Sequence, residues 1–412
     1  MARLAFRLGA GFLRGSRRDT GATVARWMRD VMARASADSL TVSIAGTRIQ
    51  VVGQREHSDR VLAISPATGC PASKLKRDAM SFLADRALTL ADGEAWTTLR
   101  QHNEQVLATG QPHPFAQAFL ESVREAFASP VADIEDIRHA MGLAMTGIVL
   151  GDAAGTRDAA ADVTILFGVV QSPVRRKLLA FRYRQRRERF RALLDRCWEQ
   201  SAADAPTLIA LARATTTQAE RETLLHQVPH WMFTFTGSGT DLLTRTLALV
   251  TARPVVLRRV LDEIAAAGPL EQAATYARLP LLDACLHETG RLYPPVTRTF
   301  HQSAANGGGP ATELVHWFPL LQRDERLGAD VHDFVPDRWL APERDAAAAA
   351  SNLFLRGPRA CPGADLILFV CRAAIARLLI ELNSRGHSAR LARDPLPVSF
   401  PTREARFTVS EA

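Results

Sequence analysis

The spacing of apolar positions predicts a mainly helical protein with a small β part. Apolar and polar residues alternate around a Gly-Thr step in residues 40–53, which predicts a strand pair or hairpin. A long apolar helix is expected over residues 221–254, with Pro229 as an early kink and Pro254 at its end. Other helices are expected near Ala22–Ala35 and over residues 96–107, 131–151, 173–198, 255–268, 279–295 and 365–382. A flexible loop is expected at 304–313, a short strand at 314–321 and an alanine-rich connector at 346–350.

No internal repeat and no strong linker interrupts this pattern, so we expect one domain over residues 22–412 after a basic lead-in, residues 1–21. The lead-in is rich in arginine and has no acidic residue before Asp19. A transit peptide and an amphipathic surface segment are the alternatives for it. No apolar run in the sequence reaches the length of a membrane span.

The charge and cysteine content narrow the class of protein. The 412 residues carry a formal net charge of +8, yet aromatic and basic residues do not interleave as in nucleic-acid modules, so we expect no nucleic-acid partner. The five cysteines are odd in number and include no C-x-x-C pair. This usage favours reduced thiols in a cytoplasm over a disulfide framework or a structural zinc site.

One cysteine stands in an unusual setting, the segment "FLRGPRACPG" at residues 354–363. Gly357 permits a left-handed turn, and Pro362 suits the first turn of the helix that follows. Cys361 is therefore expected at a helix N-terminus, beside Arg359, where backbone N–H groups stabilise a thiolate. A lone thiolate fits haem iron better than zinc, and an ordinary buried cysteine is the alternative.

This segment resembles the cysteine-ligand loop of the cytochrome P-450 family, the haem-thiolate monooxygenases. The family pattern F-x-x-G-x-R-x-C-x-G is matched without departure by Phe354, Gly357, Arg359, Cys361 and Gly363. Three further family motifs follow the family's order: W-x-x-x-R at Trp96 and Arg100, E-x-x-R at Glu288 and Arg291, and F-x-P-x-R ending at Arg338. Together they cover nearly the whole chain.

The resemblance implies the cytochrome P-450 fold, with haem b (iron protoporphyrin IX) between a long central helix and the cysteine loop and its helix. Cys361 would be the axial iron ligand, and Glu288, Arg291 and Arg338 would form a structural triad. Arg100 and Arg359 would pair with the haem propionates, and either Arg298 or His301 would join them. The same resemblance places Trp96, Phe354 and Gly363 against the cofactor.

The stretch "TGSGTD", residues 236–241, is similar to the family's oxygen-side motif A/G-G-x-D/E-T. Thr240 matches the family threonine, but Gly239 stands where an acid is usual, and Asp241 follows one place later. Haem-thiolate chemistry needs proton delivery on this side, so Thr240 and Asp241 are the catalytic candidates. A solvated or structurally paired Asp241 is the alternative to a proton relay.

By position, the resemblance suggests a mostly apolar substrate pocket. Its candidates are Met80 and Phe82 in a loop, then Phe233, Thr236, Gly237, Val296 and Thr297.

We therefore expect a cytoplasmic, monomeric, iron-containing oxidoreductase, a monooxygenase of a small, mostly apolar organic compound, in specialised-metabolite biosynthesis. No flavin or iron–sulfur domain is found, so a separate ferredoxin or flavodoxin with its reductase would supply electrons. A haem-thiolate enzyme of another reaction class (peroxide-driven oxidation, dehydration, oxidative coupling or rearrangement) and a non-catalytic haem-binding protein are the alternatives.

Overall fold

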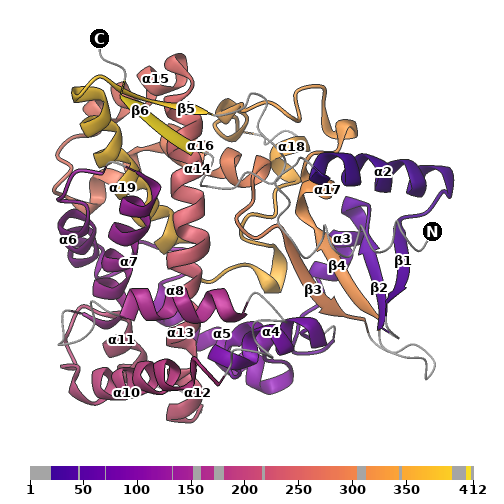
Figure 1. The fold of residues 1–412 in the computed structure, drawn as a ribbon, viewed down its shortest axis with the longest axis horizontal. Helices are drawn as coiled ribbons and strands as arrows, with labels where there is room; N and C mark the ends of the chain where they lie inside the picture. Colours follow the sequence, from indigo (N-terminus) through magenta and orange to yellow (C-terminus); the bar gives the residue numbers. More distant parts are fainter. Residues whose placement is uncertain are drawn as a thin grey trace.

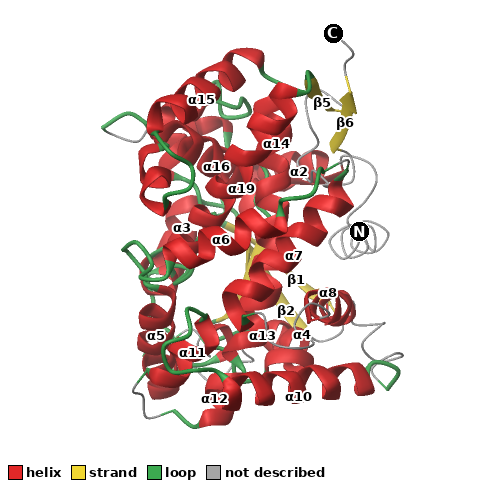
Figure 2. Ribbon diagram, turned by 90° about the vertical axis from the view of Figure 1, so that its left-hand side faces the viewer, coloured by secondary structure: helices red, strands yellow, loops and turns green. Residues whose placement is uncertain are grey.

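The computed structural model describes residues 20–44, 47–69, 71–131, 133–151, 159–170, 181–215, 219–303, 312–342, 346–391 and 405–409. Helices make up most of these residues, and most of them form one side of the molecule, while a four-stranded sheet lies on the other side with a few helices beside it (Figure 1). Figure 2 shows the same helical body from its flank, with the strands largely behind it. The mainly helical class that the periodicity predicts is confirmed.

The α-helices are α2 (Thr20–Arg34), α3 (Arg55–Leu62), α4 (Lys74–Ala84), α5 (Gly93–Leu107), α6 (Ala116–Ala126), α7 (Ile134–Leu150), α8 (Ala159–Val170), α10 (Arg184–Gln200), α11 (Leu208–Ala214), α12 (Arg221–Leu225), α13 (Gln227–Phe233), α14 (Thr240–Thr251), α15 (Pro254–Ala267), α16 (Pro280–Leu292), α17 (Phe318–Gln322), α18 (Ala346–Ala349) and α19 (Ala364–Ser384). A π-helical turn, η2 (Thr234–Gly239), joins α13 to α14. Short tight turns are η1 (Leu88–Leu90), η3 (Ala273–Arg278), η5 (Glu325–Leu327), η6 (Pro336–Trp339) and η7 (Gly357–Arg359). The strands are β1 (Ser39–Ile44), β2 (Thr47–Val52), β3 (Arg298–Gln302), β4 (Glu313–Trp317), β5 (His387–Leu391) and β6 (Ala405–Val409).

The main sheet joins two distant parts of the chain in the order β1-β2-β4-β3. Strands β1 and β2 form the predicted antiparallel hairpin, with Leu40 opposite Val51, and β2 then pairs in parallel with β4. The strand predicted over residues 314–321 is only partly right, because β4 ends at Trp317 and α17 begins at Phe318. Pro319 lies in the first turn of α17, where its missing N–H costs no helical hydrogen bond.

The core of the helical body lies around α14 and α19. Almost every residue of α14 is buried, including polar ones such as Thr244 and Thr246, and α14 contacts α7, α16 and α19. A helix that is buried on all sides must lie inside the protein rather than on its surface. The run from α13 through η2 to α14 therefore crosses the helical body, as Figure 1 shows.

The helix predicted over residues 221–254 is interrupted twice, so that prediction is wrong in detail. The break falls at His226, between α12 and α13, and the helix also widens into the π-helical turn η2. Pro229 therefore lies in the first turn of α13 instead of kinking a continuous helix. The break is held by Gln227, whose side-chain amide donates to Arg86 O and whose oxygen accepts from Leu88 N at 2.9 Å.

Other expectations need correction or fall outside the described residues. Met80 and Phe82 were expected in a loop but lie on α4, which Ser73 caps by accepting a hydrogen bond from Lys76 N at 3.0 Å. The alanine-rich connector contains the short helix α18. The loop at 304–311, residues 171–180 and residues 1–19 of the basic lead-in lie outside the described residues.

Candidate functional site

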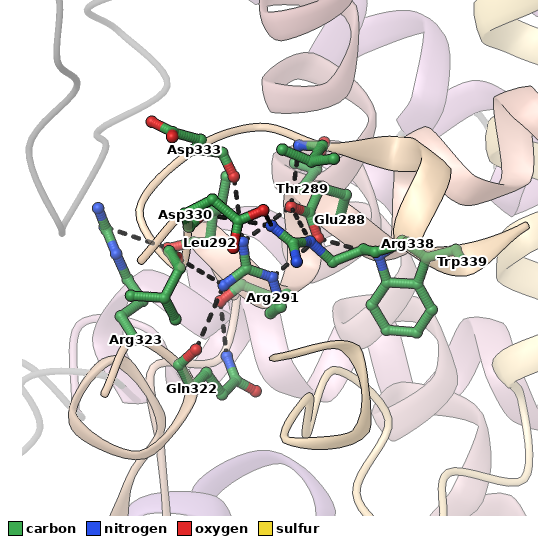
Figure 3. Close-up of polar contacts among 12 residues, drawn as sticks. Glu288, Thr289, Arg291, Leu292, Gln322, Arg323, Asp330, Asp333, Arg338 and Trp339 are labelled. Atoms are coloured by element: carbon green, nitrogen blue, oxygen red, sulfur yellow. Dashed lines mark hydrogen bonds and ion pairs between the residues drawn. The ribbon is translucent and has the colours of Figure 1, made fainter. Parts of the chain in front are cut away.

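Glu288, Arg291 and Arg338 meet in the interior, as Figure 3 shows. Arg291 is buried and holds both oxygens of Glu288, with Nε–Oε2 at 2.8 Å and Nη2–Oε1 at 2.7 Å. Arg338 Nε also donates to Glu288 Oε1, at 3.1 Å, and Trp339 Nε1 donates to Oε2. One carboxylate therefore ties α16 to the irregular chain that contains η6. The E-x-x-R spacing predicts the first pair, since three residues on a helix share one face.

Residues next to this cluster (Glu288, Arg291 and Arg338) contact the cysteine segment, by ring packing and by the close approach of one glycine. The His287 ring stacks on Trp339 at 4.9 Å between centroids and meets the Phe354 ring edge-on at 6.1 Å. A Cβ added to Gly290 would lie 2.6 Å from Leu353 Cδ1, so only glycine lets α16 approach this closely. The cluster thus positions the chain that leads into the cysteine loop.

The cysteine loop is held by short hydrogen bonds on both sides. Cys361 N donates to Phe354 O at 2.7 Å, and Gly357 adopts the left-handed φ of +56° that the sequence predicts for it. Thr109 Oγ1 donates to Pro362 O at 2.7 Å, which fixes the loop against the end of α5. Gly363 is the N-cap residue of α19, and its position for a Cβ lies 3.5 Å from the Phe235 ring of η2. The loop therefore packs directly against the π-helical turn.

Cys361 differs from the other cysteines that the structure describes. Cys197, Cys285 and Cys371 are buried, whereas Cys361 is exposed. Desolvation is nevertheless the main cause that raises the pKa of its thiol. A hydrogen bond from Gly363 N–H and the charge of Arg100 act in the opposite direction. The exposure of Cys361 disfavours the ordinary buried cysteine.

Basic side chains gather near this thiol. Arg100 donates to Ala360 O and, at 2.6 Å from Nε, to Glu104 Oε1 on the next turn of α5. Trp96 packs against the core one turn earlier on the same helix. The positive charge that acts on the thiol belongs to Arg100, although the sequence suggested its neighbour Arg359. Arg359 is half-buried and close enough to His301 to lower the pKa of that imidazole.

Strand β3 contributes Arg298 and His301, the two alternatives for one role. Arg298 is half-buried, its guanidinium lies 5.7 Å from the Phe300 ring centroid, and burial lowers its pKa. His301 is buried, and among the described residues its Nδ1 has no hydrogen-bond partner. Burial is also the main cause that lowers the pKa of His301, so its ring is neutral. A buried, unsatisfied ring nitrogen beside arginines fits the carboxylates of a cofactor such as haem.

Thr240 is exceptional among the threonines of the long helical run. Five of them donate to the carbonyl four residues earlier at 2.6–2.8 Å, namely Thr234, Thr236, Thr244, Thr246 and Thr251. Thr240 is also buried, but within the described chain its Oγ1 has no hydrogen-bond partner. The π-helical turn η2 ends immediately before it, and such turns often occur at functional sites. This hydroxyl is free to bond a ligand or water.

The space beside Gly239, where the family usually has an acidic side chain, is occupied by a side chain of α19. A Cβ on Gly239 would lie 2.6 Å from Ile367 Cδ1 and 3.3 Å from Met141 Cε. The next acid along the chain, Asp241, bonds Arg245 Nη2 at 3.2 Å, and Arg245 also donates to Tyr293 O at 2.9 Å. The structure therefore favours the paired state of Asp241 that the sequence left as an alternative.

The substrate candidates lie on elements that contact one another. Phe82 on α4 and Phe233 on α13 are buried, and these two helices pack together. Thr236 is buried with its hydroxyl bonded to Met232 O, and Gly237 is half-buried on η2. Val296 and Thr297 precede β3, and Val296 is exposed. Phe82 is also covered by Arg187, whose guanidinium lies 4.9 Å from the ring centroid.

Two basic residues near this site, Lys76 and His230, were missed by sequence reasoning, and a third, His102, was expected on an exposed basic face but is buried. Lys76, His102 and His230 each have a pKa lowered mainly by burial, to about 8, 4 and 3 respectively. Both ring nitrogens of His102 lack hydrogen-bond partners among the described residues. No local pattern marks these residues, because their burial depends on helices that are distant in sequence.

A cavity of about 380 Å³ lies elsewhere, between α6, α7, α10 and the start of α11. Glu121, Glu125, Cys197 and Thr207 are among its lining residues, and none of the predicted site residues lines it. It is therefore a separate feature of the surface.

No helix within the described residues is long and apolar enough to cross a membrane.

Comparisons with known proteins point to one family. The family model described as cytochrome P-450 matches residues 174–384. The monooxygenase aunB of Aspergillus niger is 27% identical over 183 residues, which cover 39% of this chain and 40% of that protein. Cytochrome P-450 52A10 of Candida maltosa is 34% identical over 137 residues, 29% of this chain and 26% of that protein. The chain thus spans less than half the length of these curated relatives.

A solved structure extends the likeness to the whole fold. Retinoic acid bound cyanobacterial CYP120A1 is similar with a TM-score of 0.70, 16% identity and coverage of 92% of both chains. At this low identity the likeness shows the fold only. Since the family model matches about half of the chain and the fold is shared throughout, this protein belongs to the cytochrome P-450 family.

Proposed function

We propose that this protein is a haem-thiolate monooxygenase, which inserts one oxygen atom of O₂ into a small, mostly apolar organic substrate and reduces the other to water. The observation that carries the proposal is Cys361, an exposed cysteine at the start of α19, where desolvation raises the pKa of its thiol. A role in specialised-metabolite biosynthesis, in a cytoplasm and as a monomer, belongs to the same proposal.

The cofactor would be haem b, held by Cys361 on one side. Arg298, Arg359 and the neutral His301 are placed to bond its carboxylates, and Arg100 adds positive charge near the thiol. Trp96, Phe354 and Gly363 would pack against it. When bound, haem supplies the activation of oxygen, with the thiolate as electron donor to the iron. The unsatisfied Nδ1 of His301 supports this assignment, since a buried ring nitrogen needs a partner.

Thr240 would hold water and pass a proton on the oxygen side. Its hydroxyl is free, while the neighbouring threonines use theirs within the helix. Asp241 would act indirectly, because its ion pair with Arg245 anchors the start of α14. Gly239 would serve the packing of η2 against Ile367 and Met141. Proton delivery would then run through water at Thr240 rather than through an acid at position 239.

The pocket for the substrate would lie between α4, α13, η2 and the chain before β3. Phe82, Phe233 and Val296 make it mostly apolar, and Thr236, Gly237 and Thr297 complete it. The solved neighbour carries retinoic acid, which is a largely apolar molecule, and this supports a substrate of that character.

Electrons would come from a ferredoxin or flavodoxin with its reductase. The basic residues on the cysteine side that could attract an acidic partner are Arg100, His102, Arg356, Arg372 and Arg377. The four arginines all have partners within the protein: Arg100 pairs with Glu104, Arg356 with Asp59 and Arg372 with Asp283, and Arg377 donates to Phe127 O. They keep their positive charge in these contacts and would supply the docking charge, whereas the buried His102 would not.

The test is the absorbance of the dithionite-reduced protein with carbon monoxide. A thiolate ligand moves the main haem band far to the red. We expect this band in the wild-type protein, its loss in Cys361→Ala, and its retention in the control Cys197→Ala. A band at the bluer position of other haem proteins in the wild type, or an unchanged band in Cys361→Ala, would refute the thiolate assignment.

Peroxide-driven oxidation is a second candidate function, favoured by Gly239 and by the pairing of Asp241 with Arg245. Hydrogen peroxide brings its own protons and electrons, so it needs no acid relay from solvent. Turnover with hydrogen peroxide that exceeds turnover with NADH, ferredoxin, its reductase and O₂ would support this candidate. The reverse order would support the monooxygenase.

A further inference from the structure

Lys76 lies on the inward face of α4. The buried residues Met80 and Leu83 follow it by four and seven positions, so all three share one side of the helix. The other charged residues of this helix are engaged elsewhere, since Lys74 pairs with Asp78 at 2.6 Å and Arg77 pairs with Asp92 at 3.3 Å. Lys76 itself is half-buried.

Helix α4 is fixed against two elements of the candidate site. Gln302 N donates to Pro71 O at 3.0 Å, and Ala72 forms a β-bridge with His301, so the start of α4 lies beside β3. On its other flank α4 packs against α13, which carries His230 and Phe233. Lys76 is therefore at the meeting point of the elements that we propose as the substrate pocket.

The groups around Lys76 are basic. Its charge is close enough to His230 on α13 and His301 on β3 to lower the pKa of both, and Arg359 acts on Lys76 in the same way. Within the described chain, no hydrogen bond or ion pair joins the Lys76 ammonium to a carboxylate. A desolvated cation that faces other basic groups is costly unless an anion binds it.

In the proposed function, the cofactor would not need this charge. Haem b brings two carboxylates, and Arg298 and Arg359 suffice for them in the proposed function. Arg100 already pairs with Glu104. One positive charge, that of Lys76, is left over on the side of α4 and α13, where the substrate would lie.

We propose that the substrate is an organic acid with an apolar body, and that the Lys76 ammonium binds its carboxylate where α4, α13 and β3 meet. This inference rests on the proposed function, because it concerns the same pocket. The buried rings of Phe82 and Phe233 would contact the apolar body. The carboxylate would set which carbon of the substrate faces Thr240, since one fixed end limits how the molecule can lie.

The experiment measures binding rather than turnover, by equilibrium dialysis of the haem-loaded protein at pH 7. Three matched pairs serve as probes: dodecanoic acid and 1-dodecanol, 1-adamantanecarboxylic acid and 1-adamantanemethanol, and 4-phenylbutanoic acid and 4-phenyl-1-butanol. We expect at least one acid to bind about tenfold or more tightly than its alcohol, the range of a charge-assisted hydrogen bond. Lys76→Met should abolish the preference, Lys76→Arg should keep most of it, and the control Lys74→Met should leave it unchanged.

The pH dependence gives an independent readout. Desolvation and Arg359 lower the pKa of Lys76 to about 8, so its ammonium is charged at pH 7 and loses its proton above pH 8. The carboxylic acids stay ionised throughout this range. The preference for the acid should therefore fall about tenfold per pH unit above the pKa of Lys76. His230 and His301 are neutral at these pH values and Arg359 stays charged, so none of these neighbours imitates the change.

Each outcome decides the inference. Equal affinity for acid and alcohol in the wild type, a preference that survives Lys76→Met, or no binding by any of the acids would overturn it. Loss of haem from Lys76→Met would also overturn it, because Lys76 would then bind a cofactor carboxylate. The carbon monoxide spectrum separates the two proposals. If the red-shifted band is present without any acid preference, only this inference fails; if the wild type lacks the band, the proposed function fails.

Discussion

Gly239 stands where the family usually has an acid, and its packing explains why a larger residue is absent. In Gly239→Ala the new methyl group would lie 2.6 Å from Ile367 Cδ1 and 3.3 Å from Ile367 Cγ1. Overpacking of this kind costs about 1–3 kcal/mol, while the gain from replacing a helical glycine is about 0.5–1 kcal/mol. We therefore expect Gly239→Ala to lower the free energy of unfolding by about 1–2 kcal/mol.

Ile367→Val tests the cause, because it removes the Cδ1 atom that the new methyl group would meet. Alone it should cost about 1 kcal/mol, as a buried methyl group is lost. In the double variant the added and removed methyl groups occupy the same space. The loss of stability in the double variant should therefore be about 1 kcal/mol smaller than the sum of the losses in the two single variants.

Urea unfolding followed by circular dichroism measures all four proteins under one condition. Leu368→Val, on the same helix and also buried, is the matched control and should show no coupling with Gly239→Ala. If Gly239→Ala is neutral or stabilising, or if its cost is the same in the Ile367→Val background, the packing explanation of the missing acid is wrong.

Three further outcomes can be checked by similar means. Arg291→Met should cost about 3–5 kcal/mol in urea unfolding, because it leaves the buried carboxylate of Glu288 short of a partner; a cost below about 1 kcal/mol would contradict this. Thr240→Val should leave stability within about 0.5 kcal/mol of the wild type, whereas Thr244→Val should lose about 1 kcal/mol with its hydrogen bond; the product formed per NADH should fall in Thr240→Val only. Burial lowers the pKa of His102 to about 4 in the folded protein. As the pH falls below 6.5, the imidazole therefore takes up a proton in the unfolded protein but not yet in the folded one, which destabilises the folded protein. The wild type should then lose about 3 kcal/mol more than His102→Leu between pH 7 and pH 4, and parallel stability curves would refute this.

The sequence predicted those parts of the site that depend on short spacings. Glu288 and Arg291 lie three residues apart on one helix, so their pairing follows from helical geometry. The left-handed turn at Gly357 and the hairpin at residues 40–53 likewise depend on residues close in the chain. The family motifs added Cys361, Arg338 and Thr240, which no spacing alone would have joined.

The errors have the opposite cause. The break at His226 depends on Gln227, which bonds the backbone at Leu88, 139 residues away. The pairing of Asp241 with Arg245 is different, because the two residues lie four positions apart on one helix and the sequence left this state open. Only the bond from Arg245 to Tyr293 O joins distant residues. The contacts with Leu88 and Tyr293 have no signature in the local sequence.

The sequence by itself indicated the helical class, the turn of the cysteine loop and the residues that we propose for haem-thiolate chemistry, because motif chemistry and periodicity are local properties. Only the tertiary structure decided that the Thr240 hydroxyl and the His301 Nδ1 are buried without partners among the described residues, and that the half-buried Lys76 lies beside other basic groups. Burial and the distance to the nearest opposite charge arise when distant helices and strands pack together. These properties are therefore set by the fold, and they are the ones that decide where a cofactor or a substrate can bind.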